Sequence, residues 1–144
     1  MKKVFLLLAI AVFLMQAKAQ EQKIIAKDVP GAVTAAFYKS NPTIKDVDWS
    51  KKGLNYIGAY EVDKVVNSST YNVSGKLIES QMEIVPSGLP TPAMDYIKLN
   101  YKENELKQAY KITDANYVVT FKAQVKGMDL TFDEKGTFIN SIKN

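Results

Sequence analysis

The stretch "YVVTFKAQVKGMDLTFDEKGTF", Tyr117 to Phe138, decides the fold because apolar and polar side chains alternate along it on both sides of a tight turn. After the dipeptide Lys126-Gly127, which is typical of a turn, the alternation resumes at Met128. A period of two residues is typical of half-buried strands, so the stretch predicts antiparallel hairpins with one face in the core. The apolar face of the first strand is predicted to carry Tyr117, Val119, Phe121, Ala123 and Val125.

Two other stretches have the spacing of short helices. In "DVPGAVTAAFYKSNP", which begins at Asp28, apolar residues recur every three or four positions, and Pro30 suits the first turn of a helix. The stretch "SGLPTPAMDYIKLNYKE", which begins at Ser87, has the same pattern with Pro90 in the same place. We therefore expect two helices, with Asp28 and Ser87 as their caps.

The second half of the chain echoes the first. "TYNVSGKLIES", Thr70–Ser80, has nearly the form of "TFDEKGTFINS", Thr131–Ser141, sixty-one positions later. The same offset places Tyr110 on Trp49 and Tyr117 on Tyr56. We predict an α+β fold: a tandem duplication of a helix plus a four-stranded antiparallel meander, forming one long twisted sheet with both helices on one face.

The predicted boundaries follow from this repeat. Residues 1–19 are a signal peptide, 20–27 an N-terminal lead-in, 28–85 the first repeat and 86–144 the second. The third predicted strand of the first repeat, "VVNSSTY", is polar on both faces in its middle. Such a strand is either an exposed edge or the lining of a wetter groove, and native edges are often polar, which favours the edge.

The first residues have the features of a secretory signal. Lys2 and Lys3 precede an apolar run from Val4 to Met15, and Ala17-Lys18-Ala19 matches an A-x-A cleavage site. The run is shorter than the roughly 20 residues that a membrane span needs. We expect cleavage after Ala19, no membrane insertion of the mature chain, and a periplasmic or secreted location in a Gram-negative bacterium.

Composition excludes several classes of chemistry. The chain has neither cysteine nor histidine, so disulfides, the common zinc sites and catalytic triads with histidine cannot form. All nineteen basic residues are lysine, and loss of residues 1–19 removes three of them, which lowers the net charge from +4 to +1. A nearly neutral mature chain gives no electrostatic reason to bind nucleic acid. We expect a protein without enzymatic activity and without a cofactor.

The order of these segments resembles a known family. "VPGAVTAAF", a proline, "VDWSKKGLNY" and a "TYNVSG" turn are followed by "LPTPAMDYI", "YVVTF" and "TFDEKGTF". This order, with Trp49 before the first hairpin and an Asp-x-x-Gly turn at Asp133–Gly136, resembles the PepSY-like periplasmic family over Asp28–Asn144. The fold of that family is similar to β-lactamase inhibitor protein.

The resemblance implies export in a bacterium of the Bacteroidetes type and a binding or inhibitory role. It implies no catalytic residue, because the family has no established one. Asn72 and Ser74 stand where the second turn is acidic or turn-forming, so a ligand role shared by both turns is not expected. Gly75 and Gly136 are predicted to be structural, since they supply the positive φ of their turns.

The candidate partner-binding residues are aromatic or polar side chains near predicted strand edges. Tyrosine and tryptophan are favoured at protein interfaces because they bring contact area at a low cost in entropy, although most rings of this chain fall on predicted core faces. The candidates are Trp49, Tyr56, Tyr110, Asn67 and Ser69.

Calcium is the weaker alternative. Asp46, Asp48 and Ser50 are spaced like the start of a calcium loop, but Lys51 and Ile57 occupy the positions where that loop needs glycine and an acid. A second acidic cluster contains Asp129, Asp133 and Glu134, and an aspartate that caps its own turn explains it without an ion.

The function predicted from the sequence is that of an exported, non-enzymatic protein that binds or inhibits a protein or peptide partner in the periplasm. The alternative is a calcium-responsive or small-ligand-binding periplasmic protein. A role for this chain in catalysis is not expected, because general acid–base chemistry is left with carboxylates, lysines and tyrosines that show no pocket-forming pattern.

Overall fold

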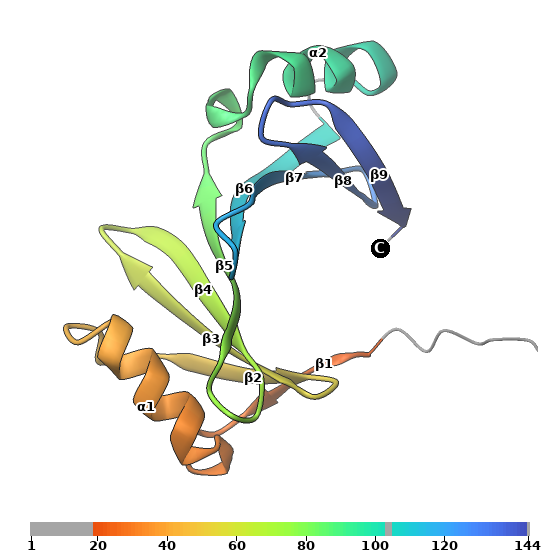
Figure 1. The fold of residues 1–144 in the computed structure, drawn as a ribbon. Helices are drawn as coiled ribbons and strands as arrows, with labels where there is room; N and C mark the ends of the chain where they lie inside the picture. Colours follow the sequence, from red (N-terminus) through yellow and green to blue (C-terminus); the bar gives the residue numbers. More distant parts are fainter. Residues whose placement is uncertain (1–18, 103–104, 144) are drawn as a thin grey trace, which may run out of the picture.

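A computed structural model describes residues 19–102 and 105–143. In this part of the chain nine strands and two α-helices follow one another, with a 3₁₀ turn before each helix (Figure 1). The helices are α1 (Gly31–Ser40) and α2 (Thr91–Asn100). The strands are β1 (Glu21–Ile24), β2 (Asp48–Lys52), β3 (Asn55–Val62), β4 (Val65–Tyr71), β5 (Leu77–Ile84), β6 (Leu106–Asp114), β7 (Val119–Val125), β8 (Met128–Asp133) and β9 (Phe138–Lys143).

The predicted fold class is wrong. The nine strands form a single antiparallel sheet in the order β1 to β9, and the two helices have only ten residues each, so the fold is mostly β. It is not a duplicated unit of a helix and a four-stranded meander. The sequence pattern gave no sign of β1, which lies in the expected lead-in and pairs with β2 from Glu21↔Lys52 to Ile24↔Trp49. Helix α1 therefore lies between two strands that pair with each other.

Both helices cover the same face of the sheet. Residues that pair directly across neighbouring strands point to the same face of the sheet. One row of such residues begins at Tyr60, which packs in the cluster under α1, and ends at Phe132, which packs in the cluster under α2. In Figure 1 the sheet bends so that the helices lie outside the curve, and we call the opposite face the concave face. The row contains Tyr60, Asn67, Met82, Lys111, Phe121 and Phe132.

Each helix begins immediately after a proline. Pro30 and Pro90 have extended backbone angles and precede the first helical residue, so they end the incoming segment and do not occupy the first turn. Neither helix has a side-chain cap, and the predicted caps Asp28 and Ser87 lie in the preceding 3₁₀ turns. The helices are therefore held mainly by packing on the sheet.

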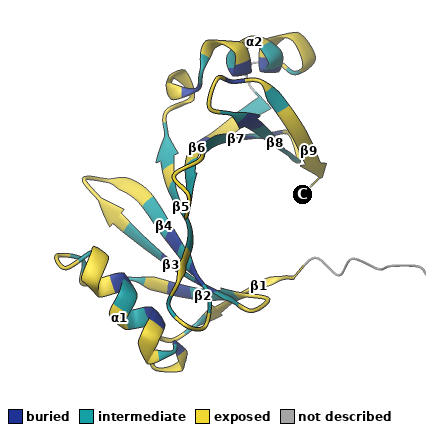
Figure 2. Cartoon of the chain, in the orientation of Figure 1, coloured by how far each residue is buried: buried dark blue, intermediate teal, exposed yellow. Residues whose placement is uncertain are grey.

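The core consists of two clusters, one under each helix, and Figure 2 shows the buried segments on the inner sides of α1 and α2. Under α1 lie Val29, Val33, Phe37, Trp49, Tyr56 and Tyr71. Under α2 lie Leu89, Ala93, Ile97, Ala109, Ala123, Val125, Leu130 and Phe132.

Two strand assignments also need correction. Tyr117 does not lie on the buried face of β7, because the strand begins at Val119 and Tyr117 sits in the preceding turn with φ of 63°. Strand β4, which the polar pattern favoured as an edge, pairs with β3 on one side and β5 on the other. Its polar residues therefore lie on the two faces of an inner strand and not along an exposed edge of the sheet.

The expected signal peptide falls almost wholly on residues outside the described part of the chain. Among the residues that are described, no helix is long and apolar enough to cross a membrane.

Candidate functional site

A groove of about 460 Å³ lies on the concave face, where β3 to β7 cross the middle of the sheet. Its floor is made by small side chains, Ala59 on β3 and Ser68 and Thr70 on β4. These residues alternate with the core residues of the same strands and therefore point away from α1. The full lining is Glu21, Lys52, Asn55, Ile57, Ala59, Val66, Ser68, Thr70, Ile78, Glu79, Gln81, Tyr110 and Lys122.

One wall of the groove is an aromatic and charged group. Tyr110 on β6 pairs with Lys122 on β7, and the Lys122 Nζ lies 5.4 Å from the centre of the Tyr110 ring. Lys122 also forms an ion pair of 3.6 Å with Asp129 on β8. Burial raises the pKa of the Tyr110 hydroxyl above its ordinary value, with a smaller contribution from the nearby Glu83 carboxylate. Tyr110 therefore remains a neutral hydrogen-bond donor at physiological pH.

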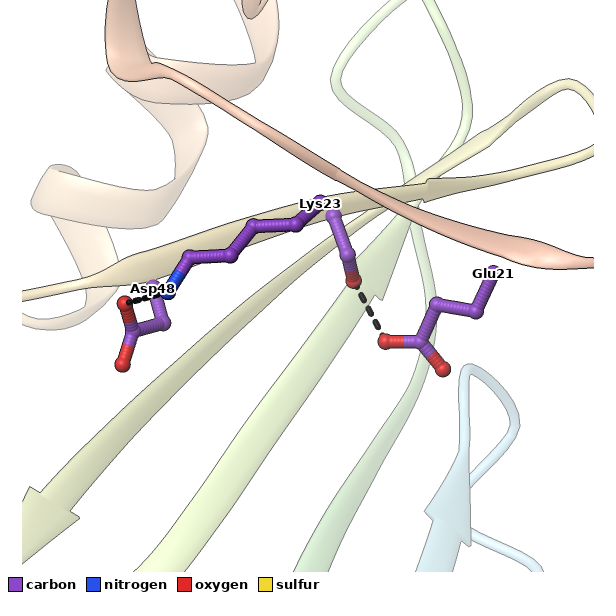
Figure 3. Close-up of polar contacts among 4 residues, drawn as sticks. Glu21, Lys23 and Asp48 are labelled. Atoms are coloured by element: carbon purple, nitrogen blue, oxygen red, sulfur yellow. Dashed lines mark hydrogen bonds and ion pairs between the residues drawn. The ribbon is translucent and has the colours of Figure 1, made fainter.

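The other end of the concave face is closed by polar contacts between β1 and β2 (Figure 3). The Ser50 hydroxyl donates a 2.6 Å hydrogen bond to Glu21, and Lys23 forms a 3.2 Å ion pair with Asp48. These pairs are largely exposed, so they contribute little to stability, but they cover the edge strand with charge.

A second hollow, of about 530 Å³, lies beside the C-terminal part of α1. Its lining includes Tyr38, the residues Lys45 to Asp48 and the outer parts of β3 and β4. Part of this wall is the loop that precedes β2, Lys45 to Val47, whereas nearly all of the groove lining lies in regular strands. A surface built on strands is held more rigidly, so the groove is the better candidate.

The aromatic candidates separate between the two faces. Trp49 and Tyr56 lie in the cluster under α1, with exposed fractions of 2% and 9%, so their rings belong to the core. Tyr110 lies in the groove. The register that matched Tyr110 with Trp49 fails because the β6–β7 connection is three residues longer than the β2–β3 connection: Thr113 pairs with Val119, whereas Lys52 pairs with Asn55. An odd number of extra residues places Tyr110 on the other face.

The polar candidates on β4 lie on the helix-covered face. Ser69 is buried, and its side chain hydrogen bonds to the buried Tyr71, whose pKa is raised by burial. Asn67 donates a 2.9 Å hydrogen bond to the carbonyl of Val65 and borders a depression of about 240 Å³. The polar middle of β4 thus lines this depression with Asn67 and the groove with its neighbour Ser68.

The acidic candidates are not gathered into a metal site. No group of three or more acidic side chains in the described residues is placed to hold a metal ion. Asp48 and Asp129 are engaged by Lys23 and Lys122. Asp46 lines the hollow beside α1.

Asp133 and Glu134 lie in the β8–β9 turn. The Asp133 carboxylate accepts hydrogen bonds from the backbone N–H groups of Lys135, at 2.9 Å, and Thr137, at 2.8 Å. The hydrogen bond from Thr137 is the main cause that lowers the pKa of Asp133 below its ordinary value. Glu134 is exposed at the same turn. The geometry is that of an aspartate capping its own turn.

The two predicted turn glycines have positive φ, 79° at Gly75 and 86° at Gly136. A side chain on Gly75 would collide with the carbonyl of Ala32 in α1, and one on Gly136 would lie 2.8 Å from Pro90. Each turn thus folds onto the start of a helix.

The groove floor, Ala59, Ser68 and Thr70, was missed by sequence reasoning. One feature of the sequence could have indicated the groove: the middle of β4 has polar residues on both faces. This pattern is expected of a strand that lines a polar groove on one face and a polar depression on the other. Only the pairing of β4 with β3 and β5 distinguishes that arrangement from an exposed edge.

Comparison with solved structures supports the fold. A protein of Bacteroides eggerthii, provisionally described as periplasmic, aligns with a TM-score of 0.72 and 14% identity over 80% of this chain and 88% of its own. A DUF2874 family protein of Bacteroides uniformis aligns with a TM-score of 0.69 and 14% identity over 79% and 88%. A BLIP-like protein of Bacteroides fragilis aligns with a TM-score of 0.62 and 18% identity over 79% and 86%.

At these identities the likeness establishes the fold alone, and that fold is BLIP-like, as the sequence resemblance implied. No family model matches the sequence, and no curated protein matches it either. The PepSY-like part of the resemblance therefore remains a prediction.

Proposed function

We propose that this chain is an exported, non-enzymatic protein that binds, or binds and inhibits, a protein or peptide partner in the periplasm through the concave face. The observation that carries the proposal is the groove lined by residues of seven strands, β1 to β7, with a floor of small side chains and Tyr110 in its wall. A floor of this kind leaves room for a side chain or strand of a partner, and the polar lining offers hydrogen bonds to its backbone.

The composition of the chain supports a binding role. Cysteine and histidine are absent from the whole sequence, which removes the thiol nucleophile and the side chain that most often acts as general base. The structural neighbours include a BLIP-like protein, and the neighbour from Bacteroides eggerthii is provisionally described as periplasmic. We extend an inhibitory role and a periplasmic location to this chain as parts of the proposal.

The test uses two adjacent residues of β4 that point to opposite faces. Ser68→Arg places a long charged side chain in the groove, whereas Asn67→Arg places the same side chain in the depression on the helix-covered face. The full chain, exported with its signal and carrying an affinity tag, is used to capture partners from the envelope fraction of the bacterium that encodes it.

We expect the wild type and Asn67→Arg to retain the same partner and Ser68→Arg to lose it. Circular dichroism and the melting temperature must show that both variants are folded. If Asn67→Arg loses the partner and Ser68→Arg retains it, the partner binds the helix-covered face and not the concave face. Repeated failure of the wild type to retain any specific partner would contradict the proposed function.

A further inference from the structure

Three hairpin turns of this protein share one local geometry. Each begins with a residue whose side-chain oxygen accepts hydrogen bonds from the backbone N–H groups two and four positions later, at 2.8 to 3.0 Å. The first residues are Asn72, Asp114 and Asp133. The fourth residue of each turn has positive φ, and it is Gly75, Tyr117 and Gly136 in turn.

Tyr117 is the exception in this series. Its φ of 63° lies in the left-handed region, which bulky side chains rarely adopt and which glycine adopts freely. The two glycines are needed because their turns contact α1 and α2, where a side chain would collide. The turn between β6 and β7 lies beside the start of β5, away from both helices (Figure 1). Space for a side chain is present there, but the backbone conformation still disfavours tyrosine.

The ring of Tyr117 is not used by the fold. Its exposed fraction is 87%, among the highest of the large apolar residues, and the adjacent Val118 is also exposed. Neither the backbone conformation of Tyr117 nor the burial of its ring therefore stabilises the fold. An observed outlier of this kind is a sound starting point for a hypothesis of function.

Hydrogen bonds order the backbone of the turn that carries Tyr117 and join this turn to the edge of the groove. The N–H of Tyr117 donates to the carbonyl of Asp114, and the Asp114 carboxylate accepts from the backbone of Asn116 and Val118. The N–H of Ala115 donates a 2.9 Å hydrogen bond to the carbonyl of Ile78, which lines the groove. An aromatic ring on a fixed backbone has only two side-chain torsions to order when it is bound, which keeps the entropy cost low, as in strong interface anchors.

We propose that Tyr117 is the anchor residue that this protein inserts into an apolar pocket on the surface of its partner protein, at the rim of the concave groove. This inference rests on the proposed function and adds to it the partner's complementary feature, a pocket that accepts a phenol ring. A protein surface is favoured over a lipid surface because the only charged side chain in residues 114–118 is Asp114. Peripheral binding to anionic membranes uses lysine or arginine beside the inserted aromatic ring.

The first experiment measures stability and needs no partner. Asparagine tolerates the left-handed region, so Tyr117→Asn removes the ring and relieves the backbone, and we expect the melting temperature to rise by about 3 °C. Leu54→Asn, at an equally exposed residue of another turn, is the control and should have no effect beyond about 1 °C. A fall in melting temperature for Tyr117→Asn would mean that the ring serves the fold, and the proposal would be overturned.

The second experiment measures binding. A photo-crosslinking phenylalanine analogue is placed at position 117, or at position 54 as control, in the exported full chain, and the crosslinked protein is identified and purified. Against that protein, Tyr117→Asn should weaken binding by about 30-fold, as expected for a hot-spot residue, whereas Tyr117→Phe should stay within about threefold.

The outcomes separate this inference from the proposed function. If Ser68→Arg abolishes binding and Tyr117→Asn leaves the affinity unchanged, the anchor is refuted and the groove stands. If neither variant alters binding, both proposals fail. Co-sedimentation of the wild type, but not of Tyr117→Asn, with vesicles of phosphatidylethanolamine and phosphatidylglycerol would replace the protein partner by a membrane and so overturn the proposal.

Discussion

The two clusters of core residues under α1 and α2 each pack a ten-residue helix onto the sheet, but they do so with different side chains. Under α1 the buried set is mostly aromatic, and Phe37 lies in edge-to-face contact with Trp49, at 5.3 Å between ring centres, and with Tyr60, at 5.2 Å. Under α2 the buried set is mostly aliphatic, with Ile97 and Leu130 fully buried and Phe132 the one buried ring.

The two clusters also differ in the small residues that make room for their large side chains. The Trp49 ring packs closely against its paired neighbour on β3, Gly58, where a side-chain carbon would lie 3.0 Å from the ring. Under α2 the paired residues Ala109 and Ala123 are both fully buried, so small side chains on two strands make room for the helix. Under α1 the space for the rings thus comes from one glycine, Gly58. Under α2 the space for the helix comes from two alanines on neighbouring strands.

The largest expected effect tests whether the two clusters carry similar weight. Phe37→Ala should lower the free energy of unfolding by about 4 kcal/mol and Ile97→Ala by about 3 kcal/mol, because both side chains are fully buried and leave cavities. Urea titration measures both. Since Trp49 is the single tryptophan, its fluorescence should change in the folded state of Phe37→Ala and stay unchanged in that of Ile97→Ala. A shift of the spectrum in both variants would show that the clusters are coupled.

The next effect compares the two turn glycines. Gly75→Ala and Gly136→Ala combine a positive φ with a close helix, so each should lower the free energy of unfolding by about 2 kcal/mol. The loss should be greater at Gly75, where the added carbon would overlap the Ala32 carbonyl of α1, than at Gly136, where its nearest atoms are 2.8 Å away in Pro90 and 2.9 Å away at the Ala93 backbone nitrogen. Thermal unfolding ranks the two, and the opposite order would show that α2 is the more rigid helix.

A smaller effect is expected at Gly58. Gly58→Ala should cost about 1 to 2 kcal/mol, because the added methyl group lies between 3.0 and 3.2 Å from Trp49 and Val47 and these side chains must shift. Ala123→Gly, the matched change in the α2 cluster, removes a buried methyl group and a strand-forming residue, and should cost about 1 kcal/mol. Near-ultraviolet circular dichroism should change only for Gly58→Ala.

The smallest effect concerns acid pH and compares Asn72 with Asp133, which cap equivalent turns. The pKa of Asp133 is lower in the folded protein than its ordinary value of 3.8, so its contribution to stability is present above that value and is lost as the pH falls through the folded pKa. Asp133→Asn should flatten the acid side of the curve of melting temperature against pH. Asn72→Asp should steepen it, and equal curves for all three proteins would contradict this account.

Much of the fold was predictable because the pattern of the strands is local. The alternation from Val119 to Phe132 marks β7 and β8, and positive φ at Gly75 and Gly136 follows from their place in polar turns. The fold class was nevertheless wrong, since "QEQKIIAK" has no alternation that marks β1, and its pairing with β2 spans the whole of α1.

The candidate site was less predictable, for a reason that Tyr110 and Trp49 illustrate. Both are aromatic residues on strands beside polar neighbours, and the sequence offset equates them. The connection between β6 and β7 is three residues longer than the one between β2 and β3, so Trp49 lies in the core and Tyr110 in the groove. Because side chains alternate with a period of two, a shift by an odd number of residues exchanges core for surface.

By itself, the sequence determined the chemistry that is excluded, the presence of two helices near Pro30 and Pro90, and the hairpins of the second half. These depend on residue types and on spacings of a few residues. The tertiary structure decided the pairing of β1, the inner position of β4, the face on which each aromatic ring lies and the conformation of Tyr117. These depend on contacts between residues far apart in the chain, which a local pattern cannot encode.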